Sequence, residues 1–204
     1  MLTTILIAAM AQAYGNTPSA PRVPSATTAT AAPVAPAAAV AGRPLRSVPG
    51  TSISYYDVSG TTVPEIELSL KTMLADAAVK DKVRLFSWKV GTQLTKATNG
   101  TKCVVQKASS TFTAKVSLPR LAEPAKVKKG VMANWTAYVA TAENNAAASL
   151  WFLTDRLRGA EQSLVGMPCD QADPAWNATL DKVKSELSAF NAQRALAAAQ
   201  KPAG

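Results

Sequence analysis

Glu143 is the residue of this chain around which an active site would most readily form. It lies in the alanine-rich stretch 141–157 directly after Ala142, and Ala146 follows one helical turn after Ala142. Residues four apart share one face of a helix, so Ala142 and Ala146 lie on the same side of the predicted helix, with Glu143 at the edge of that side. The chain has no histidine, which removes the commonest zinc ligand and the usual general base near neutral pH. From the residues alone, Glu143 is either a surface glutamate at the edge of an apolar stripe or a partly buried acid whose role is open.

Other routes to catalysis have little support in the sequence. A serine nucleophile needs a base, and the Ser–Lys combinations in "SWKV" and "SLKT" fall in ordinary strand and helix patterns. No glycine-rich phosphate loop is present. Acids such as Glu143 and Asp57 could hold a metal without histidine, which leaves an active hydrolase open as an alternative.

Positive charge is the main compositional bias. The chain carries 22 Lys and Arg against 13 Asp and Glu, a formal net charge of +9. Such a balance favours anionic surfaces, although solubility is the commoner explanation. A basic cluster, Lys126, Lys128 and Lys129, could contact anionic lipid or polymer, and a solvated helix start explains it more simply. Nucleic acid binding would need aromatic residues among the basic ones, so the sequence does not favour it.

A long helix must position Glu143. Apolar residues recur at steps of three and four from Val127 to Leu157, and this stripe predicts a helix that begins near Gly130. A second helix is predicted from Asp173-Pro174, a cap followed by a first-turn proline.

Strands are predicted ahead of the two helices. The run "TSISYYDVSG" is typical of a strand closed by a turn, and a helix with Pro64 near its start follows. Two β-rich runs are joined across Asn99-Gly100, the strongest short hairpin signal. The predicted fold class is α+β, with a small antiparallel sheet packed against a long helix and a C-terminal helix.

The first 50 residues indicate export and a tether. The apolar run "LTTILIAAM" followed by "AQA" predicts a signal peptide over residues 1–13, although an uncleaved anchor or a misassigned start would also explain it. Residues 14–50 are rich in Ala, Pro and Thr and predict a disordered linker, which leaves a folded domain over 51–200. The expected location is periplasmic, outer-membrane-associated or secreted.

Two cysteines agree with export. Cys103 lies in the predicted hairpin and Cys169 lies between the two long helices. In an oxidising compartment a pair so placed predicts a disulfide that joins sheet to helices. Two buried free thiols are the alternative.

The order of these landmarks resembles a family of bacterial predicted secreted zinc-dependent proteases, catalogued as a domain of unknown function. The resemblance covers about Thr51 to Arg194. It rests on "YYDVSG", "VSLPRL" and "NWTAYVATAEN", on the paired strands with Trp88 and Cys103, and on Cys169 ahead of a last helix. It implies a zincin-like minimal scaffold.

In that family the long helix carries His-Glu-x-x-His, and a further histidine tends to follow the last helix. Here the glutamate falls on Glu143, which the resemblance makes a relict general base, and the two histidine positions fall on Ala142 and Ala146, which it makes vacated metal-ligand positions. The final stretch, "NAQRALAAAQKPAG", has no histidine either. The resemblance therefore implies zinc in active relatives and no cofactor in this chain.

Two functions follow as expectations. The favoured one is an exported, non-catalytic pseudo-peptidase that binds a partner protein or a cell-envelope component, with peripheral contact to membrane or wall through basic surface. The alternative is an active secreted metal-dependent peptidase or hydrolase with non-histidine ligands. A mixed oligomer with an active relative is a third possibility.

Overall fold

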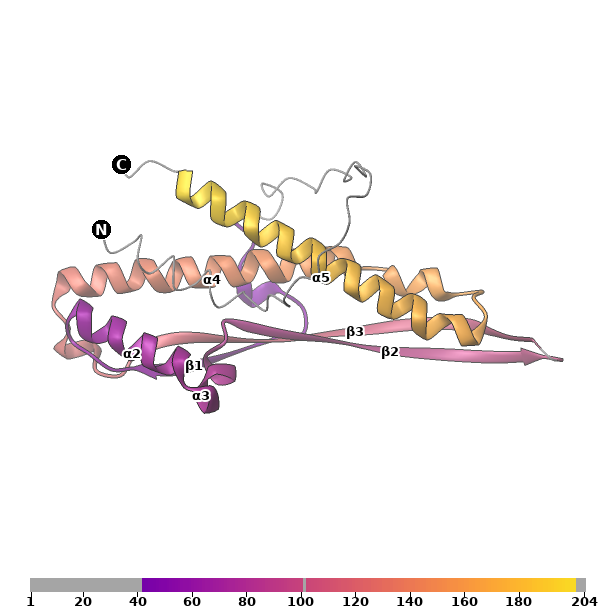
Figure 1. Ribbon diagram of the computed structural model, residues 1–204, viewed down its shortest axis with the longest axis horizontal. Coiled ribbons are helices and arrows are strands. Elements are labelled where there is room, and N and C mark those ends of the chain that lie inside the picture. The colour runs from indigo at the N-terminus through magenta and orange to yellow at the C-terminus, as the bar shows by residue number, and fades with distance from the viewer. Residues whose placement is uncertain (1–41, 101, 201–204) are drawn as a thin grey trace, which may run out of the picture.

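The computed structural model describes residues 42–100 and 102–200. Figure 1 shows an elongated molecule in which a long hairpin runs beneath two long helices, with a short strand and two short helices at one end. The elements in chain order are η2 (Leu45–Ser47), β1 (Thr51–Val58), α2 (Val63–Ala75), α3 (Ala77–Val83), β2 (Phe86–Asn99), β3 (Lys102–Leu121), η3 (Pro124–Lys126), α4 (Lys129–Leu157), η4 (Ala160–Leu164) and α5 (Cys169–Gln200). The predicted signal peptide and most of the predicted linker lie outside the described residues. None of the helices described here is both long enough and apolar enough to cross a bilayer.

The fold class is α+β, as predicted, but the sheet is mixed and not antiparallel throughout. Its strand order is β1-β3-β2. β2 and β3 form the predicted hairpin around Asn99-Gly100, where Gly100 adopts a φ of 63°. β1 pairs with β3 in parallel, with Thr51 opposite Ala114. The reason is that α2 and α3 separate β1 from β2, so β1 is not held in a hairpin and joins the open edge of β3.

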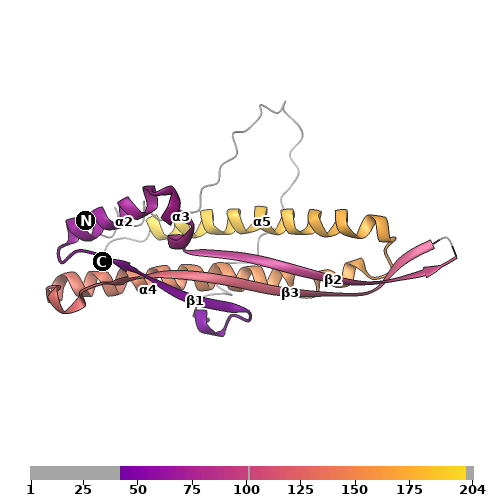
Figure 2. The same ribbon diagram turned by 90° about the horizontal axis from the view of Figure 1, so that it is seen from below.

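The hairpin turns one face to the helices and the other to solvent. Ala114 and Val116 of β3 are buried on the helix side, whereas their neighbours Thr113 and Lys115 are exposed on the other. Figure 2, the view from below, shows β2 and β3 in front with the long helices behind them. Strand alternation thus separates an apolar face from a polar one.

The middle of α4 is buried on every side. Residues 146–153 are all buried, although the stripe in the sequence predicts burial along one face. The sheet covers one side of the helix and α5 covers a second, where Phe152 stacks on Phe190 with ring centroids 4.6 Å apart. η2 covers a third side, and its Leu45 and the adjacent Val48 are 1% and 3% exposed.

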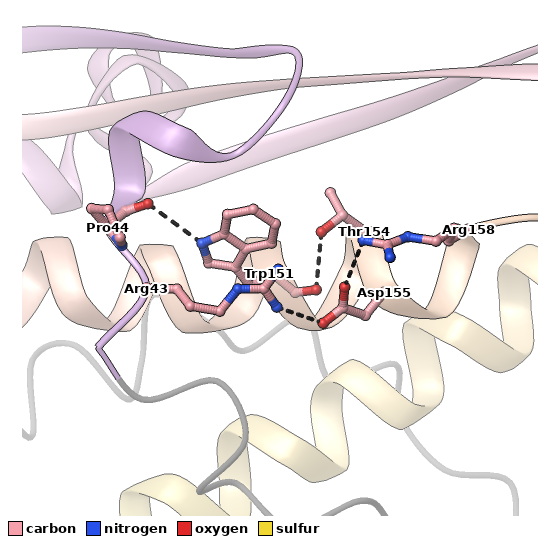
Figure 3. Close-up of polar contacts among 6 residues, drawn as sticks. All are labelled: Arg43, Pro44, Trp151, Thr154, Asp155 and Arg158. Carbon is pink, nitrogen blue, oxygen red and sulfur yellow. Dashed lines mark hydrogen bonds and ion pairs between the residues drawn. The ribbon is translucent and has the colours of Figure 1, made fainter.

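The last residues of the predicted linker belong to the folded unit. We call residues 43–48 the strap. Trp151 of α4 donates a hydrogen bond from Nε1 to the carbonyl oxygen of Pro44 at 3.4 Å, and Arg43 Cζ lies 3.5 Å from the centre of the same ring (Figure 3). Arg43 also forms an ion pair with Asp155 at 2.8 Å. The boundary predicted at residue 50 therefore falls too late, because the strap covers the side of α4 that the sheet and α5 leave open.

The long helices follow the predicted pattern with one shift. α4 begins at Lys129, and Gly159 at a φ of 72° follows its end. α5 begins at Cys169, four residues before the predicted start, and includes Pro174. Pro174 removes the hydrogen bond that residue 174 would give to the carbonyl of residue 170, and the disulfide at Cys169 holds the short segment before it.

A second, smaller core joins α2 to β1 and to the first half of α4. Val58 is fully buried in it, and Trp135 packs there with its ring centroid 5.5 Å from that of Tyr138. Glu65 helps α2 to begin, because its Oε2 accepts hydrogen bonds from two preceding backbone N–H groups at 2.8 and 3.2 Å. These bonds lower the pKa of Glu65.

Candidate functional site

The turn of α4 around Glu143 is the first candidate site. Ala142 and Ala146 are both 0% exposed and belong to the main core. Glu143 is partly exposed and makes no hydrogen bond or ion pair with another described residue. The two alanines therefore act as core residues, and the carboxylate beside them makes no polar contact with the rest of the described chain.

The end of α5 meets this same turn. Arg194 Nη2 donates to the side-chain oxygen of Asn145 at 2.9 Å, and the Ser149 hydroxyl donates to Asn191 Oδ1 at 2.9 Å. These hydrogen bonds join the last part of α5 to the turn of α4 around Glu143.

The residues at this site do not fit a zinc ion. Zinc in proteins needs three or four Cys, His, Asp or Glu ligands, and the described residues bring no three such side chains together. Asp57, the other acid named as a possible ligand, is bonded to Arg120 Nε at 2.6 Å. That hydrogen bond lowers the pKa of Asp57. No catalytic step through a metal can be built from this arrangement of side chains.

The basic cluster lies at the start of α4, where all three of its lysines are exposed. Lys126 forms an ion pair with Glu123 at 2.6 Å. Lys128 and Lys129 stand at the N-terminal end of the helix, whose dipole has the same sign as their charge. The cluster is thus a partly neutralised part of the helix start and is separate from the turn around Glu143.

Cys103 and Cys169 form the predicted disulfide, with their Cα atoms 5.5 Å apart. The bond joins the far part of the hairpin to the first residue of α5. Backbone hydrogen bonds accompany it, since Val105 donates to Met167 at 3.0 Å and accepts from Gly166 at 2.8 Å. Sequence reasoning found this link from the placement of the two cysteines.

A small cavity between α2 and α4 is a feature that sequence reasoning missed. It is lined by Val63, Ile66, Glu67, Val131, Asn134, Trp135 and Tyr138, with a volume of about 20 Å³. That is room for roughly one water molecule and excludes a substrate. Burial raises the pKa of the nearby Tyr138 and Tyr56 hydroxyls. The only signal in the sequence is the aromatic pair at helical spacing within the apolar stripe.

Comparison with known proteins gives one match. A family model described as "Bacterial protein of unknown function (DUF922)" matches residues 53–197, which include Glu143, both alanines and both cysteines. Neither the curated proteins nor the solved structures gave a match.

Proposed function

The chain belongs to the DUF922 family of bacterial proteins of unknown function, and from that premise we propose that it is an exported, non-catalytic member that works by binding. Its partner is a protein or a cell-envelope component, and its scaffold is of the secreted zinc-protease type. The peptidase character of the scaffold rests on the resemblance of the stretches around Glu143. The export rests on the apolar N-terminal run.

One observation carries this proposal. Ala142 and Ala146, the positions where the resemblance expects histidines, are fully buried core residues. A carboxylate without a metal has no water of lowered pKa to deprotonate and no electrophile to assist. Core packing accounts for alanine at these two positions more simply than hydrolysis does.

Zinc content is the direct test. We expect elemental mass spectrometry on the exported, untagged protein to give a zinc ratio near zero after gel filtration without chelator. The physical reason is that the chain offers no histidine and no cluster of three acidic or cysteine ligands among the described residues. A ratio near one would overturn the proposal, because ligands outside the described residues would then have to be sought.

Replacing Glu143 by Gln is expected to leave the protein unchanged. The carboxylate makes no ion pair with another described residue and is partly exposed, so the free energy of unfolding should move by less than about 0.5 kcal/mol. Denaturant unfolding and partner capture from the native envelope fraction are the two measurements, and each should match the wild type. Complete loss of capture at unchanged stability would contradict this prediction, because Glu143 would then be part of the binding surface, and peptide hydrolysis by the variant would have to be measured to test the catalytic interpretation.

A further inference from the structure

The β2–β3 hairpin and its flanks carry the strongest charge asymmetry in the chain. Between Lys82 and Ala122 the sequence has eight Lys and Arg and no Asp or Glu. In the helical layer, by contrast, basic residues face acids, as in the pair between Arg156 and Glu186 at 3.3 Å. Arg120 pairs with Asp57 at 2.6 Å, and five of the eight are lysines of β2 and β3, so positive charge collects on the hairpin.

Three of these lysines share the solvent face of the hairpin. Lys89, Lys107 and Lys115 are all exposed, and the register places them on the same side because cross-strand partners point the same way. None of the three makes an ion pair within the described chain. Their charge is therefore available to a partner.

The rest of this face is small or polar. Its other exposed residues along the regular part of the hairpin are Ser87, Gly91, Gln93, Thr95, Ser109, Thr111 and Thr113. We call this set, together with the three lysines, the hairpin face. Trp88 and Phe112 lie on the opposite side and pack against the main core. In Figure 1, α4 and α5 also lie on that opposite side.

The shape of the hairpin face is long and narrow. On β2 the hairpin face runs from Ser87 to Thr95, which extends over about 30 Å, and the two strands lie about 5 Å apart. Lys89 and Lys115 lie near one end of this strip and Lys107 lies at the other, with hydroxyl and amide groups between them and no acid along it. Such a surface matches a linear partner better than a compact one.

We propose that the hairpin face binds a linear anionic polysaccharide. Lysine ammonium groups complement the carboxylates of such a chain. Ser, Thr and Gln side chains donate to and accept from sugar hydroxyls between the charged points. The assignment deepens the proposed binding role by naming the ligand class, and it does not depend on the loss of zinc ligands.

Two other anionic partners fit the hairpin face less well. Single-stranded nucleic acid is bound by aromatic side chains that stack on bases, and the hairpin aromatics face the core. Arginine is the residue best suited to phosphate and base recognition, and the face carries lysine alone. A membrane surface is bound through apolar side chains beside the basic ones, which the regular part of the face lacks.

The test compares two triple variants of the full disulfide-bonded chain. The first is Lys89→Gln, Lys107→Gln, Lys115→Gln. The matched control is Lys126→Gln, Lys128→Gln, Lys129→Gln, which removes the same charge from the start of α4. All six side chains are exposed, so both variants should unfold at the wild-type midpoint. The probe is a fluorescent polygalacturonate oligomer, with neutral dextran, duplex DNA and phosphatidylglycerol vesicles as comparison ligands.

We expect the wild type and the control variant to bind polygalacturonate with equal affinity. The affinity of the hairpin variant should be lower by a factor of about ten or more. Binding should fall as salt rises, because exposed charges are screened within about 8 Å at physiological ionic strength. Equal losses in both variants, or tighter hairpin-dependent binding of DNA or vesicles, would overturn the inference. A chain that binds the glycan but also carries zinc would overturn the proposed function alone.

Discussion

Loss of the Cys103–Cys169 disulfide is expected to lower the free energy of unfolding by roughly 4 kcal/mol. The cysteines are 66 residues apart, and in the chain-entropy model a cross-link that closes a loop of this length restricts the unfolded chain by about that amount. The enclosed segment contains most of β3 and the whole of α4. An effect of this size is a large fraction of the stability of a domain of this length.

The measurement is denaturant unfolding of the wild type and of the double variant Cys103→Ala, Cys169→Ala, each with and without reductant. Reductant should shift the wild-type midpoint to that of the variant and should leave the variant unchanged. Thiol labelling of the native wild type should find no free thiol, because the two cysteines are bonded to each other. A wild-type midpoint that does not respond to full reduction would contradict the prediction.

The second large effect is expected from Trp151→Ala. The indole is 8% exposed and lies between the strap and α4, where it donates to Pro44 and stacks with Arg43. Truncation of a buried aromatic residue to alanine costs about 3 to 5 kcal/mol. Here it also removes the surface on which the strap lies, so residues 43–48 should detach from the core.

Limited trypsin digestion followed by mass spectrometry detects the detached strap. The wild-type resistant core should begin before Arg46, whereas the variant core should begin after it. Trp88→Ala is the matched control, since Trp88 packs against the same core from β2 and stacks on Phe112 at a centroid distance of 6.4 Å. That variant should lose stability and keep the strap protected. Cleavage after Arg46 in the folded wild type would show that the strap is not held.

Two contacts hold the parts of the molecule to one another. The strap is attached to α4, and the disulfide attaches the far part of the hairpin to α5. The hairpin face is then presented on a support fixed at both places. Rigid support of an exposed surface lowers the entropy lost on association.

The sequence by itself predicted the elements that depend on near neighbours. The apolar stripe gave α4 within two residues of its start, Asn99-Gly100 gave the hairpin, and the placement of two cysteines gave the disulfide. Turn chemistry and helical periodicity are properties of residues two to four positions apart, so they can be read locally. The burial of Ala142 and Ala146 followed from the same stripe.

Tertiary structure alone decided which open edges and faces became covered. The pairing of β1 with β3, the strap on α4 and the contact of Arg194 with Asn145 join residues that lie far apart in the chain. Periodicity in the sequence indicates that one face of an element is apolar. It does not indicate which segment of the chain covers that face. A proline-rich stretch with few large apolar residues gave no sign that Leu45 and Val48 would complete the core. The reason is that long-range contacts cover apolar faces and pair backbone groups that the local elements leave exposed. Which faces and groups are left exposed depends on the fold of the whole chain.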